Sequence, residues 1–123
     1  MEEDRLAQAY TLNRQQKKAA LAILDACLHD HGQSKLFFIN GPGGSGKTYT
    51  YNYIVHKLRS LTAPHIVREA ACSAVTGLAS NLLPDGRTTH SLFKIPVPCN
   101  SESNCYVPPS SDYAEYLRSI SLF

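Results

Sequence analysis

Long apolar runs are missing from this sequence. The longest, such as residues 36–39, are far shorter than the ~20 apolar residues that a transmembrane helix needs. The N-terminus is acidic and no apolar stretch follows it, which argues against a secretory signal and against an Arg-rich transit peptide. Long blocks of like charge, internal repeats and low-complexity segments are also absent, so no disordered tail is indicated. Together these absences predict a soluble intracellular protein with no membrane contact.

Closely spaced cysteine pairs are missing too. None of the four cysteines, Cys27, Cys72, Cys99 and Cys105, belongs to a Cys-x-x-Cys pair. Cys99 and Cys105 are near His90 in the sequence, but the ligand spacing of common zinc sites is absent. Reduced thiols in a reducing compartment are therefore favoured over a zinc site.

The length and the net charge of the chain do not indicate which kind of molecule it binds. The chain has 123 residues, which suits one small domain or part of a larger one. It carries 12 Lys and Arg residues against 10 Asp and Glu residues, a formal charge of +2. Such a small excess neither requires nor excludes a nucleic-acid partner, so the motifs must indicate the function.

Hydrophobic periodicity and turn signals predict an α/β fold. The expected elements are a helix that Asn13 begins and His31-Gly32 ends, a helix over 47–61, strands over 35–40 and 65–71, short helical segments over 76–83 and 90–93, an irregular loop over 96–110 and a last helix over 111–119. Asn13 and Gln16 have the spacing of a capping box at the first helix. Arg68 and Glu69 are unusual for a buried strand and put its register in doubt. The alternation of strands and helices indicates a parallel sheet with flanking helices and a right-handed crossover.

The strongest motif is a glycine-rich loop between the first expected strand and the helix after it. It matches Gly-x-x-x-x-Gly-Lys-Thr and consists of Gly41, Pro42, Gly43, Gly44, Ser45, Gly46, Lys47 and Thr48. Glycines allow positive φ and close approach to an anion, and successive backbone N–H groups form a nest for phosphates. The start of the helix adds its partial positive charge. Lys47 is expected near the β- and γ-phosphates and the Thr48 hydroxyl at magnesium, so the loop predicts binding of a nucleoside triphosphate.

Four segments carry a family resemblance. They are residues 12–16 (Leu-Asn-Arg-Gln-Gln), 38–49 around the glycine-rich loop, 75–80 (Val-Thr-Gly-Leu-Ala-Ser) and 82–96. The last includes Gly-Arg-Thr-x-His-Ser-x-Phe-Lys-Ile-Pro, a pattern that few other P-loop proteins carry. In this order the segments resemble the N-terminal part of the PIF-type DNA helicases of superfamily one, especially those related to Helitron transposons. The resemblance covers residues 11–123 and leaves 1–10 as a helical or frayed lead-in.

The resemblance implies an incomplete RecA-like P-loop NTPase fold and an ATP-dependent helicase. Such helicases move 5′ to 3′ along single-stranded or partly duplex DNA, and they serve DNA repair, recombination and telomere maintenance. The implied cofactors are ATP and magnesium, and the implied location is the nucleus, with the mitochondrion as an alternative. By position, Gln16 is implied to read adenine, residues 43–48 to hold the phosphates, and Lys47 and Thr48 to be catalytic. The residues implied to contact DNA are Thr76, Gly77, Arg87, Thr88 and His90.

Several of these residues also have simpler interpretations. Gln16 can complete the capping box, with or without reading adenine. Thr76 can be a helix N-cap, and a loop histidine such as His90 is more often a surface or structural residue. The three tyrosines between residues 49 and 53 point in different directions on a helix, so we expect packing rather than base stacking.

The chain departs from the family in one large respect. P-loop NTPases use an acidic residue at the end of a later strand to hold magnesium and orient the attacking water. Asp25 falls in an expected helix before the loop and Asp85 in a turn, so neither fits. The family pattern places Asp-Glu after the helix over 111–119. We therefore expect a domain truncated before the Walker B strand, without the second RecA-like domain, and poorly stable and inactive by itself.

Three functions compete on these grounds. The first is an ATP-dependent DNA helicase represented by its N-terminal part. The second is a non-catalytic, transposon-derived remnant that at most binds ATP or DNA. The third is another P-loop enzyme such as a nucleotide kinase, which would need acceptor-site and lid residues where the helicase segments stand. The helicase family is favoured, with this chain alone inactive.

Overall fold

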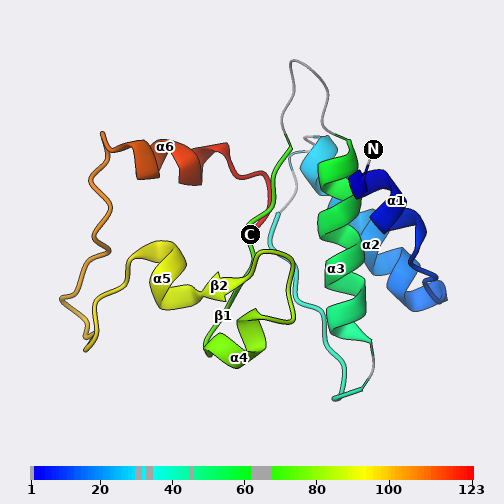
Figure 1. Cartoon of the computed structure of the whole chain (residues 1–123), viewed down its shortest axis with the longest axis horizontal. Coiled ribbons are helices and arrows are strands. Elements are labelled where there is room, and N and C mark those ends of the chain that lie inside the picture. Colours follow the sequence, from blue (N-terminus) through cyan, green and yellow to red (C-terminus); the bar gives the residue numbers. More distant parts are fainter. Residues whose placement is uncertain (1, 30–31, 33–34, 45, 62–67) are drawn as a thin grey trace. The chain divides into compact units, whose positions relative to one another are not determined.

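The computed structural model describes residues 2–29, 32, 35–44, 46–61 and 68–123. The chain divides into two compact units, Met1–Glu69 and Ala70–Phe123, each of which is described by itself (Figure 1). The first unit contains the helices α1 (Glu2–Gln8), α2 (Arg14–Leu28) and α3 (Lys47–Ser60). The second contains β1 (Ser73–Ala74), α4 (Gly77–Ser80), β2 (Arg87–Thr88), α5 (Thr89–Phe93) and α6 (Asp112–Ser119). No helix of the described residues is both long enough and apolar enough to span a bilayer.

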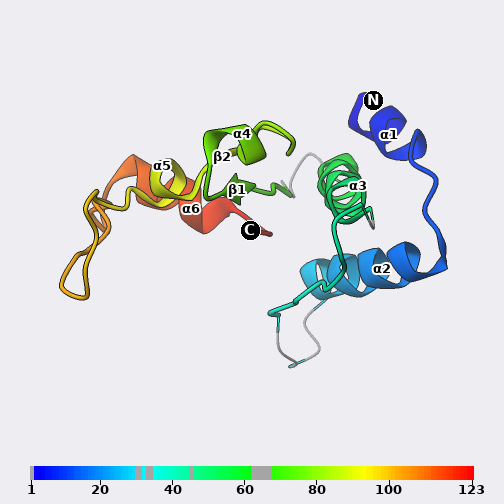
Figure 2. The same ribbon diagram turned by 90° about the horizontal axis from the view of Figure 1, so that it is seen from below.

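Helix α3 is the centre of the first unit, because α1 and α2 both pack against it (Figure 2). The apolar side chains recur at helical spacing and are buried where the helices meet. They are Ala7 on α1, Ala20, Ile23 and Leu24 on α2, and Ile54, Val55 and Leu58 on α3. The predicted capping box is confirmed at the start of α2. Asn13 Oδ1 accepts from the backbone N–H of Gln16, and Gln16 Oε1 accepts from that of Asn13, both at 2.9 Å.

Tyr10 connects the N-terminal lead-in, residues 1–10, with helix α3 through aromatic packing. Its ring centroid lies 4.8 Å from that of Tyr49 and 6.1 Å from that of Tyr53. The backbone N–H of Thr11 donates to the Tyr49 hydroxyl at 2.7 Å, and Glu3 pairs with His56 at 2.7 Å. Burial, followed by the neighbouring Tyr49, raises the pKa of Tyr10. Tyr49 and Tyr53 are therefore packing residues, as the sequence predicted, and the lead-in is a helix.

The predicted strand over 35–40 is wrong, since these residues form neither strand nor helix. Leu36 and Phe38 are each 90% exposed. A strand must pair its N–H and C=O groups with a neighbouring strand. Among the described residues, strand pairing occurs only between β1 and β2 and at one bridge from Ala70 to Leu122, all in the other unit. The apolar run alone could not supply such a partner.

The predicted strand over 65–71 is also wrong where it can be checked. Residues 65–67 lie outside the described residues. Arg68 and Glu69 are not in a strand, and the Glu69 carboxylate instead accepts from Arg59 Nε at 2.6 Å. Only Ala70 pairs, through a parallel bridge with Leu122. The two polar residues thus interrupt the strand, in agreement with the doubt that they raised.

The second unit is built on a small parallel sheet. Ser73 pairs with Arg87 and Ala74 with Thr88, and α4 lies in the connection between the two strands (Figure 1). Leu92 of α5 is 1% exposed and forms the core together with Ala70, Ala71 and Ala114. The parallel pairing was predicted, but the position of both strands was not.

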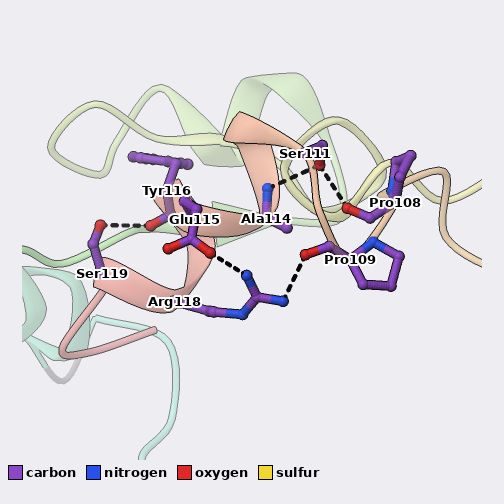
Figure 3. Close-up of polar contacts among 8 residues, drawn as sticks. All are labelled: Pro108, Pro109, Ser111, Ala114, Glu115, Tyr116, Arg118 and Ser119. Carbon is purple, nitrogen blue, oxygen red and sulfur yellow. Dashed lines mark hydrogen bonds and ion pairs between the residues drawn. The ribbon is translucent and has the colours of Figure 1, made fainter.

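Side-chain caps fix where the helices of the second unit begin. Thr76, Thr88 and Ser111 each accept a backbone N–H three residues later at 3.2 Å. Figure 3 shows the start of α6, where the Ser111 hydroxyl also donates to the carbonyl of Pro108 at 2.7 Å. The last helix predicted over 111–119 is confirmed, as are helical turns within 76–83 and 90–93.

Candidate functional site

The glycine-rich loop leads directly into α3. Gly46 is the residue before the helix and has φ +85°, and Gly44 has φ +79°. Both values lie in the left-handed region that glycine adopts without strain. Among the described residues, no side chain caps the start of α3. Its first backbone N–H groups are therefore free of a competing side-chain acceptor, which is the condition for holding an anion there.

Three donors hold the carbonyl oxygen of Gly46 in place. The backbone N–H and the hydroxyl of Thr50 reach it at 3.0 and 2.9 Å, and Gln16 Nε2 reaches it at 3.3 Å. Thr50 is 2% exposed. Gln16 therefore connects the start of α2 with the start of α3. It still retains one N–H and one lone pair of its amide, because each end of the amide has a second hydrogen-bonding position.

Lys47 closes the loop on itself, since Lys47 Nζ donates to the carbonyl of Gly41. The ammonium group thereby lies against the backbone that would surround a phosphate. Thr48 is exposed on the first turn of α3. Pro42, Gly43 and Gly44 are exposed, and Ser45 lies outside the described residues.

The described part of the loop suits a triphosphate. No heavy atom lies within 4 Å of the position that a Cβ would take on Gly43 or Gly44, so the loop is open on that side. Lys47 supplies a full positive charge, and the uncapped start of α3 supplies N–H donors. Thr48 offers one hydroxyl oxygen as a ligand to magnesium. Among the described residues, no group of three His, Cys, Asp or Glu side chains could hold a metal by itself.

The residues expected to contact DNA all lie in the second unit. Thr76 is the N-cap of α4 and Thr88 the N-cap of α5, so the simpler interpretation of Thr76 is correct as far as its local role goes. Gly77 begins α4 with open space around it, and His90 is exposed on α5. Arg87 is half-buried in β2. These residues therefore cluster on α4, β2 and α5.

Two residues beside this cluster were missed by the sequence analysis. Tyr113 contacts Arg87, and the Lys94 ammonium group lies over the Tyr113 ring. Tyr113 is 26 residues from Arg87 in the sequence, so no local spacing could have paired them. Lys94 lies within the quoted helicase segment, but nothing in that segment distinguished it from an ordinary surface lysine.

A glycine-rich loop with Lys and Thr at the uncapped start of a helix defines the class of P-loop nucleotide-binding proteins. The family model for PIF1-like helicases matches residues 11–123, and the chain belongs to that family. The match begins after α1 and includes every residue of the loop and of the second unit. Helicase function with ATP, magnesium and DNA is thus supported at the level of the family. No curated protein matches the sequence.

Proposed function

We propose that this chain is the nucleotide-binding part of an ATP-dependent DNA helicase with an incomplete RecA-like fold, and that residues 11–123 are the N-terminal part of that domain. The observation that carries the proposal is the geometry at Gly46. This glycine has a left-handed backbone, begins α3 without a side-chain cap and is followed by Lys47, which bonds back across the loop. Family membership supports the same activity.

In the proposed site the chain's own residues have distinct tasks. The backbone of residues 41–46 surrounds the phosphates, and Lys47 releases the Gly41 carbonyl to contact the β- and γ-phosphates. Thr48 holds magnesium, which would neutralise phosphate charge when bound. Gln16 reads adenine with the remaining N–H and lone pair of its amide, while the capping box and the bond to Gly46 persist.

The second unit supplies the proposed contact with single-stranded or partly duplex DNA. Its residues are Thr76, Gly77, Arg87, Thr88 and His90. Movement 5′ to 3′, a role in repair, recombination or telomere maintenance, and location in the nucleus or the mitochondrion belong to the same proposal through the family.

For the chain by itself we propose binding without turnover. Asp25 lies in α2 and Asp85 in a turn, so neither is proposed as the magnesium-binding carboxylate that hydrolysis requires. Unwinding also requires a second RecA-like domain to close on the nucleotide. The non-catalytic remnant that binds ATP or DNA is the alternative, and both proposals give the same behaviour for residues 1–123.

Replacing Lys47 with alanine tests the nucleotide site. We expect binding of a fluorescent ATP analogue with magnesium to weaken roughly 10- to 100-fold, because a charge-assisted hydrogen bond contributes about 1.5–3 kcal/mol. Lys18→Ala is the matched control, since it removes one charge from an exposed position on α2. Equal binding by wild type and Lys47→Ala would contradict the proposed site. Magnesium-dependent phosphate release that Lys47→Ala abolishes would contradict the absence of turnover.

A further inference from the structure

Two positive charges meet at one tyrosine ring in the second unit. Lys94 Nζ lies 4.7 Å from the centroid of the Tyr113 ring, a cation–π distance. Arg87 Nη1 donates to the hydroxyl of the same tyrosine at 3.3 Å. The ring comes from α6, whereas the cations come from β2 and from the end of α5. We call Arg87, Lys94 and Tyr113 the two-cation cluster.

The Tyr113 hydroxyl gives the cluster a fixed orientation. It donates to the carbonyl of Leu92, so its lone pairs face the donor from Arg87. Arg87 Nη2 donates to the Ser91 hydroxyl at 3.1 Å. The guanidinium group is therefore held by two neutral oxygen acceptors, and neither of them cancels its charge.

Backbone hydrogen bonds also fix the positions of Arg87 and Lys94. Arg87 pairs with Ser73 in the sheet, and its N–H donates to the carbonyl of Cys72 at 3.1 Å. Lys94 ends α5 with φ +55°, and its carbonyl accepts from the N–H of Tyr106 at 2.9 Å. The two charges are thus placed by adjacent elements, Arg87 by β2 and Lys94 by the end of α5.

Neither cation of the cluster forms an ion pair with a carboxylate in the described part of the chain. Arg118, also on α6, is different. Its guanidinium group pairs with Glu115 and donates to the carbonyl of Pro109 at 2.8 Å (Figure 3). Two like charges that contact the same tyrosine without a counter-ion favour an anion, and Lys94 is exposed.

We propose that Arg87 and Lys94 bind backbone phosphates of single-stranded DNA, and that Tyr113 is the positioning residue for both. This inference rests on the proposed function and adds Lys94 and Tyr113 to it. A role for Tyr113 in base stacking is disfavoured, because Lys94 covers the ring and the ring centroid of Tyr116 lies 5.6 Å away. Phosphates offer the charge that two unpaired cations require, independently of base sequence.

The test is binding of a fluorescein-labelled oligothymidylate to the full chain, followed by fluorescence anisotropy between about 50 and 200 mM salt. For single strands the slope of log K against log salt changes by about 0.7 for each phosphate contact. Lys94→Ala should lower the slope by about this amount and weaken binding several-fold, and Lys94→Arg should restore both. Arg118→Ala is the matched control and should change neither, because its charge is already paired.

Tyr113→Phe separates the orientation of the Arg87 guanidinium group from its charge. It keeps the ring under Lys94 and removes the hydroxyl, together with its bonds to Arg87 and to the Leu92 carbonyl. The charge of Arg87 remains, so the salt slope should stay the same. Affinity should fall roughly two- to five-fold, because the guanidinium group must be ordered on binding. Circular dichroism of each variant confirms that the helices are retained.

The outcomes distinguish this inference from the proposed function. If the wild-type chain does not bind the oligonucleotide, the proposed DNA contact fails and the two-cation cluster fails with it. If the wild type binds and Lys94→Ala has the wild-type slope, only the role of Lys94 is overturned. If Arg118→Ala lowers the slope as much as Lys94→Ala, net charge rather than this cluster is responsible, and the inference is likewise overturned.

Discussion

Gly86→Ala is expected to destabilise the second unit strongly. A Cβ on Gly86 would lie 2.0 Å from the carbonyl oxygen of Ser80, 3.0 Å from its carbonyl carbon and 3.1 Å from the Cβ of Leu83. The first two atoms belong to the backbone at the end of α4, and the Ser80 carbonyl already accepts from Leu83 N–H at 3.2 Å. The connection from α4 to β2 must therefore shift, and the pairing of Arg87 with Ser73 shifts with it. We expect a loss of roughly 3 kcal/mol or more in the free energy of unfolding.

Gly77→Ala is the matched control for stability in the same unit. Gly77 begins α4, and nothing lies within 4 Å of the position of its Cβ. Alanine there should leave the unfolding free energy unchanged or raise it by up to about 1 kcal/mol, because alanine favours a helix and restricts the unfolded chain. Urea unfolding followed by circular dichroism measures both variants. Equal midpoints for Gly86→Ala and wild type would show that the close approach at Gly86 is absent in solution.

Helices were predictable here because their signals are local. Asn13 and Gln16 are three residues apart and form the capping box that begins α2. Ser111 likewise caps α6 with a hydroxyl that the sequence shows directly. The end of α3 at Ser60 lies one residue before the expected end, which is within the usual uncertainty of helix ends. A helix makes its hydrogen bonds within its own segment, so sequence alone constrains it well.

Strands were not predictable to the same degree, because a strand depends on a distant partner. Residues 35–40 have the composition of a buried strand, yet they form none. Ser73 and Ala74 lie in a segment of mostly small residues, yet they pair with Arg87 and Thr88. Parallel pairing joins segments that are far apart in sequence, and the apolar pattern does not say which of them meet.

In the candidate sites, too, local features could be predicted from the sequence and contacts between distant residues could not. The proposed phosphate loop was predicted from spacing alone, because its glycines and Lys47 are neighbours in sequence. The connection from Gln16 to the Gly46 carbonyl spans 30 residues and was visible only in the structure. The same holds for the contact of Tyr113 with Arg87. A motif therefore indicates the ligand, whereas the residues that position the motif depend on tertiary packing.

Gly46 is where such positioning should have its largest effect on nucleotide binding. Alanine there would have to keep the left-handed φ of +85°, which costs an L-residue about 1–2 kcal/mol. Its Cβ would also lie 2.4 Å from Gln16 Nε2. The Gln16 amide can swing away, but it then loses its bond to Gly46 and its half of the capping box, which together contribute about 1 kcal/mol or more. We expect Gly46→Ala to destabilise the first unit by roughly 2–3 kcal/mol and to weaken binding of an ATP analogue at least tenfold.

Two further variants separate the backbone strain at a left-handed φ from the steric clash with the Gln16 amide. Gly32→Ala introduces alanine at a φ of +67° with nothing within 4 Å of its Cβ, so it carries the strain alone. Gly46→Ala combined with Gln16→Ala removes the collision and leaves the strain at the loop. If the amide is what Gly46→Ala displaces, the double variant loses less stability than the sum of the two single variants, because both remove the same hydrogen bonds. Strict additivity in urea unfolding would instead mean that Gln16 does not hold the loop, and Gly46 would then act through its backbone conformation alone.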